Sequence, residues 1–260
     1  MSPLSQHIFV GDNRFHLDQV DSTNAYAQLL LSKNKPVAGT AITTMFQTNG
    51  RGQIGRFWYS SHGKNALCSI ILYPTSISAT DQFWLSVAMS CAVRSVVNSL
   101  ITNELISIKW PNDIYVGNKK IAGLLIQNSL KGNIISNSIV GIGVNVNEPV
   151  FPKELPNPTS IYLHKKELTD LEKFYDRLFL DVAKYYQKLV FKQHDALKSE
   201  YLDHLYKLNV SAKYQLSNGE VIIGTIKNVT ELGKLVMDIN GKEQIFSFRE
   251  ITLFHEEAKP

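Results

Sequence analysis

A glycine-rich, cationic segment, QTNGRGQIGRFWYS, occupies residues 47–60. Its glycines let the backbone wrap closely around a ligand, and Arg51 and Arg56 add guanidinium groups that pair with carboxylates or phosphates. Trp58 could shield such a ligand or stack on a base. The first and last glycines have the spacing of a phosphate-binding P-loop, but the Lys-Ser/Thr pair that must follow is absent. The segment therefore favours another kind of anion site, with a plain basic surface loop as the alternative.

A second motif, KWPND, spans residues 109–113. Pro111 fixes its own φ and disfavours helix in the residue before it, so the motif predicts a stiff, extended segment. In such a segment Lys109, Pro111 and Asp113 share one side, which places a cation near a carboxylate. Asn112 adds a neutral donor and acceptor. A purely structural ion pair between Lys109 and Asp113 is the alternative.

The strands that follow add further candidates. Lys119 and Lys120 come after a Gly-Asn turn, and adjacent strand residues face opposite sides, so one lysine is expected to face the same way as Asp113. Strand glycines allow a ligand to approach a sheet closely, although a packing role is equally compatible with them. The glycines concerned are Gly123 in IAGLL and Gly141 and Gly143 in GIGVNVN. Asn145 and Asn147 follow on one face of the same predicted strand.

The elements that position these motifs follow from hydrophobic periodicity. Strands are predicted at 15–20, 40–46, 65–73, 107–110, 113–117, 120–127 and 134–147, and short strands after residue 206 predict a small β-barrel. A helix is expected after Ser22 or Thr23, whose hydroxyl would cap it. Another is expected over 81–100, and a long one after a capping box formed by Thr169 and Glu172.

Composition places the chain among ordinary globular proteins, with 44% apolar and 19% charged residues in 260. No stretch approaches the roughly 20 apolar residues of a membrane helix, and no secretory signal is evident, so a cytoplasmic protein is expected. Cys68 and Cys91 lie in apolar runs and are expected to be buried, reduced thiols. Residues 23–79 contain five cations and no acid, which favours an anionic ligand nearby.

Taken together, these motifs resemble those of the biotin protein ligases. The resemblance rests on STN at 22–24, Q-x-x-GRG-x-x-GR-x-W at 47–58, KWPND at 109–113, K-IAG-LL at 120–125 and GIG-VN at 141–145. It implies an α+β fold: a mixed β-sheet flanked by helices, of the class II synthetase-like kind, over residues 1–206. A C-terminal SH3-like β-barrel would cover 207–260, and the helices are expected against one face of the sheet.

The resemblance also implies an ATP-dependent reaction. Biotin and ATP would form biotinyl-5′-AMP, usually with Mg²⁺, and the biotinyl group would pass to a lysine of the biotin carboxyl carrier domain of acetyl-CoA carboxylase or a related carboxylase. The catalytic residues would be Lys120, Arg51, Asp113 and Lys109. Biotin would be bound by Ser22, Thr23, Asn24, Gln47, Gly50, Arg51, Gly52, Lys120, Gly123 and Gly141. The nucleotide would be bound by Arg51, Arg56, Trp58, Lys109, Asn112, Lys120 and Asn145.

Gln53 and Gln127 depart from the family, which often has Arg and Glu there, so one loop cation is missing. With STN so near the start, no DNA-binding domain is expected, and a dedicated ligase without DNA or membrane partners follows. No His, Cys and Glu spacing predicts a protein-built metal site, and the glycine-rich loop is expected to be poorly ordered without ligand. A homodimer is left open. A lipoate or octanoyl transferase and a non-catalytic nucleic-acid-binding module are the alternatives.

Overall fold

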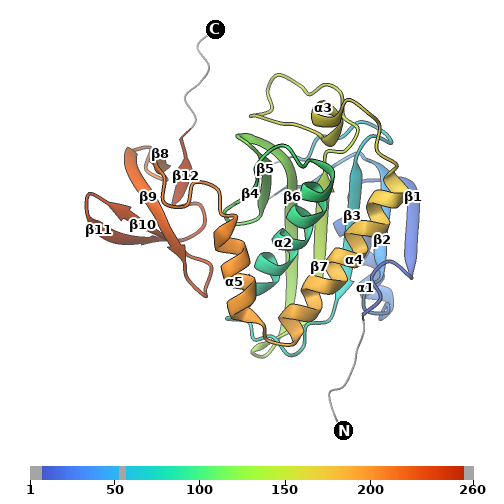
Figure 1. The fold of residues 1–260 in the computed structure, drawn as a ribbon. Helices are drawn as coiled ribbons and strands as arrows, with labels where there is room; N and C mark the ends of the chain where they lie inside the picture. The colour runs from blue at the N-terminus through green and yellow to red at the C-terminus, as the bar shows by residue number, and fades with distance from the viewer. Residues whose placement is uncertain (1–7, 53–56, 255–260) are drawn as a thin grey trace.

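The computed structural model describes residues 8–52 and 57–254 (Figure 1). The larger of its two sheets has seven strands in the order β1-β2-β3-β7-β6-β5-β4, in which only β1 and β2 are parallel neighbours. Its strands are β1 (Arg14–Val20), β2 (Ala41–Gln47), β3 (Ala66–Leu72), β4 (Ile106–Lys109), β5 (Asp113–Val116), β6 (Lys119–Lys131) and β7 (Ile134–Val144). The expected mixed sheet is thus confirmed.

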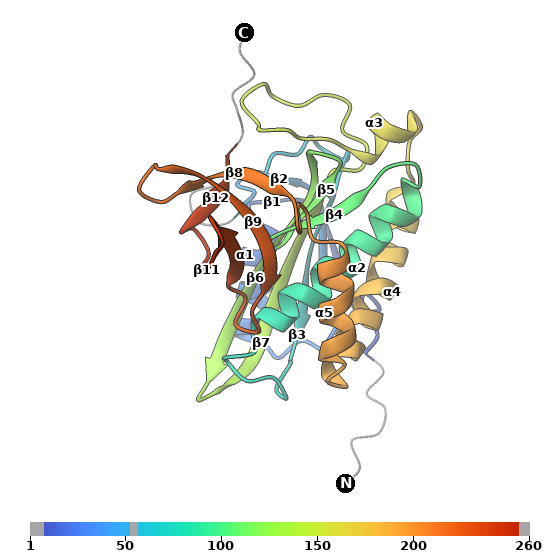
Figure 2. The same ribbon diagram turned by 60° about the vertical axis from the view of Figure 1, so that its left-hand side comes forward.

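Helices cover both faces of this sheet, so the expectation that they lie on one face is wrong. The helices are α1 (Thr23–Lys33), α2 (Phe83–Leu100), α3 (Ile161–Lys165), α4 (Leu171–Val190) and α5 (His194–Asp203). One face carries α2 and α4, with α5 packed against them (Figures 1 and 2). On the other face, Ala27 of α1 packs against the branched side chains Ile42, Ile71 and Ile139.

Helix α2 is long and apolar enough, by length and composition, to cross a membrane. In the fold it is the central core helix: Leu85, Ala88, Met89 and Ala92 are fully buried against the sheet and α4. Its apolar character is therefore accounted for by packing.

The smaller sheet follows α5 and has the strand order β11-β10-β9-β8-β12. Its strands are β8 (Ser211–Leu216), β9 (Val221–Val229), β10 (Leu235–Ile239), β11 (Lys242–Phe246) and β12 (Ile251–Leu253). Gly219, Gly233 and Gly241 form the turns with positive φ, the conformation that glycine adopts without strain. Trp110 Nε1 donates a hydrogen bond of 2.9 Å to the Gly233 carbonyl and so ties this sheet to the larger one.

Two capping predictions are wrong in detail. Ser22 occupies the N-cap position of α1, but its side chain makes no capping bond. At the start of α4 the cap is Asp170, whose carboxylate accepts from the backbone N–H groups of Glu172 and Lys173. The preceding Thr169 is held instead by Asn147, which bonds both its N–H and its carbonyl.

Candidate active site

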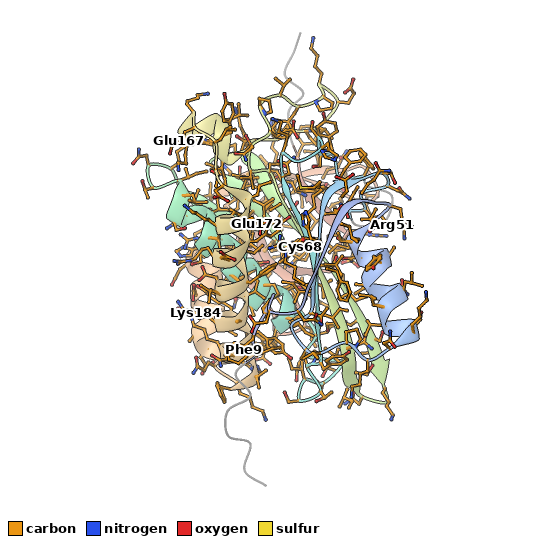
Figure 3. All side chains as sticks on the ribbon, turned by 90° about the vertical axis from the view of Figure 1, so that its right-hand side faces the viewer. Phe9, Arg51, Cys68, Glu167, Glu172 and Lys184 are labelled. Carbon is orange, nitrogen blue, oxygen red and sulfur yellow. The ribbon has the colours of Figure 1, made fainter. Side chains whose placement is uncertain are left out.

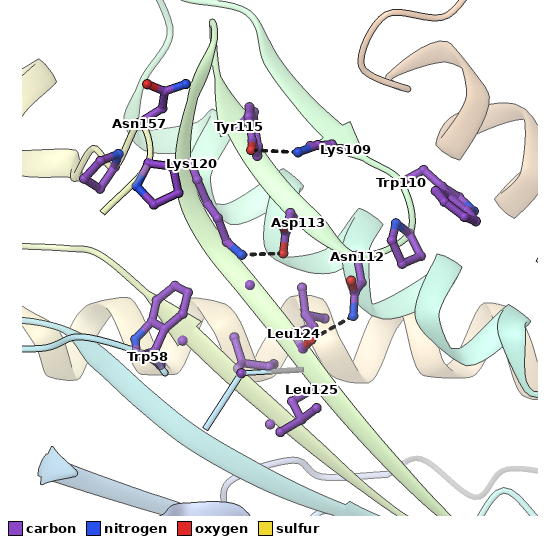
Figure 4. Close-up of a pocket in the computed structure, with 18 of the residues that line it drawn as sticks. Trp58, Lys109, Trp110, Asn112, Asp113, Tyr115, Lys120, Leu124, Leu125 and Asn157 are labelled. Carbon is purple, nitrogen blue, oxygen red and sulfur yellow. Dashed lines mark hydrogen bonds and ion pairs between the residues drawn. The ribbon is translucent and has the colours of Figure 1, made fainter. Parts of the chain in front are cut away.

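A cavity of about 660 Å³ lies where the two sheets meet (Figure 4). It brings together fourteen of the residues that were predicted to be catalytic or to bind biotin or the nucleotide: Ser22, Thr23, Asn24, Gln47, Arg51, Gly52, Trp58, Lys109, Asn112, Asp113, Lys120, Gly123, Gly141 and Asn145. Gly50 does not line it; its carbonyl accepts the Trp58 backbone N–H at 2.9 Å, which closes the base of the glycine-rich loop. Arg56 and Gln53 lie outside the described residues, as do residues 54 and 55 of the loop whose order was predicted.

The lining is strongly cationic. Arg51, Lys109 and Lys120, which come from separate segments, all line the cavity, as the sequence required. Lys207 and Arg249 add two cations that sequence reasoning missed. Among the described lining residues the acidic side chain is Asp113 alone. A wall with five cations and one carboxylate attracts a polyanion.

Within the described part of the chain, Asp113 pairs with Lys120 rather than with Lys109. Lys120 Nζ lies 2.7 Å from Asp113 Oδ1, and both side chains are about three-quarters buried (Figure 4). Lys109 donates to the Tyr115 hydroxyl at 3.2 Å and lies over its ring. The neighbouring Lys119 is exposed, so one lysine of the pair faces Asp113, as predicted.

KWPND forms a turn and not the extended segment expected from Pro111. β4 ends at Lys109, the Trp110–Pro111 peptide is cis, and β5 begins at Asp113. The backbones of Lys109 and Asp113 are therefore opposite each other in the register of a tight hairpin, although their side chains form no ion pair with each other among the described contacts. Asn112 sits inside this turn and donates to the Leu124 carbonyl at 2.7 Å, which fastens the hairpin to β6. The motif thus delivers its cation and carboxylate by folding back rather than by strand alternation.

The Trp58 ring lies against two glycines of the sheet, Gly143 and Gly123. A Cβ on Gly143 would lie 2.6 Å from its ring, and one on Gly123 would lie 3.1 Å away. Lys120 Nζ lies 5.6 Å from the centre of the same indole. The Trp58 Nε1 is buried and, among the described residues, has no hydrogen-bond partner. The glycines therefore admit this chain's own tryptophan to the sheet, next to the lysine.

The other end of the cavity is polar and neutral. Gln47 Oε1 accepts the Thr23 backbone N–H at 2.8 Å. Asn24 donates to the Leu125 carbonyl at 3.2 Å and to Gln127 Oε1 at 3.1 Å, which gives Gln127 a partner that the sequence did not suggest. Ser69, behind Thr23 and Asn24, was also missed. Its signal is a lone hydroxyl in the apolar strand ALCSIIL.

Asn145, just after β7, donates to the Thr159 carbonyl at 2.9 Å and so holds the proline-rich segment that forms one rim of the cavity.

Cys68 is buried, and Figure 3 shows it in the interior, whereas Arg51 lies on the α1 side of the sheet, away from α4. Burial raises the pKa of the Cys68 thiol to about 12, with Arg14 lowering it to a smaller extent. A thiol that is this hard to ionise is a packing group rather than a nucleophile.

Comparison with known proteins agrees with this geometry. Residues 17–145 match the profile of the Biotin/lipoate A/B protein ligase family. The Biotin–[acetyl-CoA-carboxylase] ligase of Paracoccus denitrificans is 31% identical over 180 residues, which cover 66% of this chain and 72% of the relative. The Bifunctional ligase/repressor BirA of Bacillus subtilis is 28% identical over 243 residues, or 92% of this chain and 73% of the relative.

The fold agrees as well. The biotin protein ligase from Aquifex aeolicus, solved in complex with biotin and ATP, superposes with a TM-score of 0.78 at 24% identity, covering 94% of this chain and all of that one. At that identity the likeness concerns the fold alone. On the family profile and the Paracoccus relative, this chain belongs to the Biotin/lipoate A/B protein ligase family.

Proposed function

We propose that this protein is a biotin protein ligase that activates biotin with ATP and transfers it to a lysine of a carrier domain. The observation that carries the proposal is the convergence of Arg51, Lys109 and Lys120 on one cavity whose other end is neutral and polar. Biotin needs both ends, because its carboxylate must meet a phosphate while its ureido ring needs neutral donors and acceptors.

In the first half-reaction a biotin carboxylate oxygen attacks the α-phosphorus of ATP, and the bond to the β-phosphate breaks to release pyrophosphate. The two reactants are anions, so positive charge must screen them. We assign this screening to Lys120 and Arg51, which would hold the carboxylate and then the adenylate phosphate, and to Lys109 for the remaining phosphate charge. Each charge-assisted hydrogen bond of this kind contributes about 1.5–3 kcal/mol.

In the second half-reaction the carrier's lysine amine attacks the acyl carbon, the bond to AMP breaks, and the amine loses a proton. We assign to Asp113 the role of orienting or deprotonating that amine, because it is the carboxylate among the described lining residues. Its present partner is Lys120, so an incoming amine would replace one ammonium group by another at the same oxygen.

Trp58 would cover the adenine base of the bound nucleotide. Its indole already lies against the cavity wall at Gly143 and Gly123, and an aromatic face stacks on any base. Ser22, Thr23 and Gln47 would contact the ureido ring at the opposite end. Asn112 and Asn145 make structural bonds here, and we propose that they shape the nucleotide site through their hairpin and rim.

The described residues do not build a metal centre, since no group of three His, Cys, Asp or Glu side chains is found among them. Mg²⁺ neutralises phosphate charge in many phosphoryl-transfer enzymes. We therefore assign any Mg²⁺ to the phosphates of ATP rather than to protein ligands.

By analogy with the named relatives, the carrier would be the biotin carboxyl carrier domain of acetyl-CoA carboxylase. Cys68 and Cys91 are free thiols, which suits a protein of the reducing cytoplasm.

The test is mass spectrometry of a biotin carrier domain after incubation with the protein, biotin and Mg·ATP. The carrier should gain the mass of one biotinyl group, and Lys120→Ala should abolish the gain. Lys119→Ala, the same change at the exposed neighbour, should leave it intact. A lipoyl adenylate formed in place of a biotinyl one would contradict the proposal, and retained activity in Lys120→Ala would contradict the site assignment.

A further inference from the structure

A buried carboxylate, Glu148, lies outside the cavity, at the start of the proline-rich segment that forms its rim. It follows shortly after β7 ends at Val144, and it is only 2% exposed. It does not line the cavity, and none of the sequence motifs includes it. Burying a carboxylate costs free energy unless hydrogen bonds satisfy it, so the partners of Glu148 indicate what it holds.

Those partners lie on the segment that connects the glycine-rich loop to β3. The backbone N–H of Ser61 donates to Glu148 Oε2 at 3.0 Å, and the Ser61 hydroxyl donates to Oε1 at 2.8 Å. Asn65 Nδ2 donates to Oε2 at 2.8 Å. Hydrogen bonds to an ionised acceptor are stronger than those between neutral groups. Both oxygens of Glu148 therefore hold the end of the glycine-rich loop.

Neighbouring bonds fix Glu148 itself. Its carbonyl accepts the Ser160 hydroxyl at 2.6 Å, which ties its backbone to the start of α3. Asn65 Oδ1 accepts the Val146 N–H at 2.9 Å, and the same amide donates to Ser60 Oγ at 3.1 Å. The carboxylate is thus held at a fixed place beside the segment that it binds.

The consequence for the cavity runs through Trp58. Ser61 follows Trp58 by three residues, and Glu148 follows Gly143 by five. The indole of Trp58 lies against Gly143, where a Cβ would be 2.6 Å from the ring. The bonds between Ser61 and Glu148 therefore join the segment that carries the indole to the segment that carries the glycine beneath it. On its other side, the Trp58 N–H is held by the Gly50 carbonyl.

We propose that Glu148 is a positioning residue for nucleotide binding, which holds Trp58 against the glycines of β6 and β7 through Ser61. The inference rests on the proposed function, in which Trp58 covers the adenine. A side chain that is already in place loses less conformational entropy when the ligand binds. Loss of Glu148 therefore weakens the binding of ATP. The binding of biotin is kept, because its proposed ureido contacts lie at the other end of the cavity.

Two substitutions at Glu148 separate its bonds from its charge. Glu148→Ala removes all three bonds. Glu148→Gln keeps them, because the amide oxygen accepts from the Ser61 N–H and from Asn65, while the new NH₂ donates to the Ser61 hydroxyl after that hydroxyl rotates. Glu154→Ala is the control, since Glu154 is an exposed carboxylate of the same proline-rich segment.

The experiment measures pyrophosphate release as a function of ATP and of biotin concentration. Glu148→Ala should raise the KM for ATP by about tenfold, the effect of losing one base-stacking contact, and should leave the KM for biotin unchanged. Glu148→Gln and Glu154→Ala should resemble the wild-type protein. In a Trp58→Ala background, Glu148→Ala should cause no further rise in the KM for ATP, whereas a general loosening of the fold would act in both backgrounds.

Hydrogen exchange without ligands provides an independent measurement. By mass spectrometry, the amides of residues 57–61 should exchange faster in Glu148→Ala than in the wild-type protein or in Glu148→Gln. An unchanged KM for ATP in Glu148→Ala, or an equal rise with and without Trp58, would overturn the inference and leave the proposed function intact. Absence of pyrophosphate release from the wild-type protein would overturn both.

Glu148→Ala leaves buried donors without an acceptor, so its folding must be checked by circular dichroism. If it is unfolded, Ser61→Ala decides, because this change removes only the bond from the Ser61 hydroxyl to Glu148. It should raise the KM for ATP in the wild-type background and not in Trp58→Ala. An unaltered KM for ATP in Ser61→Ala would then contradict the inference.

Discussion

Lys120 Nζ and Asp113 Oδ1 form a 2.7 Å ion pair inside the cavity. The cation assigned to the biotin carboxylate is therefore already bound to the carboxylate assigned to the carrier lysine. An anionic ligand must compete with Asp113 for Lys120, and binding of that ligand would release Asp113 for the second half-reaction. The pair links the two steps through one interaction.

Asp113→Asn separates these steps. Without the negative charge Lys120 is free to meet the ligand, so adenylate formation should be retained or raised. Transfer to the carrier should fall by about 100-fold, the usual contribution of a positioned acid or base. Pyrophosphate release measures the first step, and carrier mass gain from preformed adenylate measures the second. Asp176→Asn, on the exposed side of α4, is the control, and an equal loss in both steps would contradict the division of roles.

Gly143→Ala tests the position of Trp58. The added methyl would lie 2.6 Å from the indole, which must leave the sheet. If Trp58 covers the adenine, the KM for ATP should rise by about tenfold or more, since base stacking contributes about 1–3 kcal/mol. Biotin binding should change less. Gly224→Ala, at a strand glycine of the smaller sheet that meets a flexible methionine terminus, is the comparison; an unaltered KM in Gly143→Ala would refute the assignment.

Cys68 gives a prediction for alkaline pH. Burial raises its pKa from the ordinary 9.0 to about 12, so the folded state favours the neutral thiol. The resulting stability is fully present below pH 9 and is lost as the pH rises from 9 toward 12. The free energy of unfolding should therefore decline more steeply over this range in the wild-type protein than in Cys68→Ala. If urea denaturation showed the same loss in the free energy of unfolding between pH 8 and pH 10.5 for both proteins, this prediction would be contradicted.

Much of the fold could be predicted because its elements carry long apolar patterns. The run ALCSIIL became β3, fully buried, and the periodic apolar face after residue 170 became α4. Prediction failed where a distant partner decides a local choice. Thr169 was expected to cap α4, yet Asn147 holds its backbone from 22 residues away, and Asp170 caps the helix instead.

The site was predicted from local motifs, and what was missed comes from contacts between segments. Nothing near Arg249 or Lys207 in the sequence indicates that the smaller sheet reaches the cavity. Likewise, strand alternation in KWPND suggested a Lys109–Asp113 pair, whereas the hairpin and the register of β6 bring Lys120 to Asp113. Likewise, Ser69 contacts Thr23 and Asn24 only because α1 packs against β3.

Arg249 lines the cavity with a backbone φ of 76°, a region that non-glycine residues adopt at a cost. Arg249→Gly should therefore raise the free energy of unfolding by about 1 kcal/mol, because glycine has no steric penalty there. It also removes a cavity cation, so the KM for ATP should rise while biotin affinity is kept.

Arg177→Gly cannot serve as a control, since it would weaken α4. Lys207→Ala, which removes a cation from the same wall, separates the effect of charge from that of backbone strain. Thermal unfolding and ATP kinetics of both variants decide: Arg249→Gly should gain stability and lose ATP affinity, whereas Lys207→Ala should only lose affinity. A destabilised Arg249→Gly would show that the arginine stabilises the fold through contacts such as that of its guanidinium group with the Phe248 ring, whose centre lies 5.7 Å away.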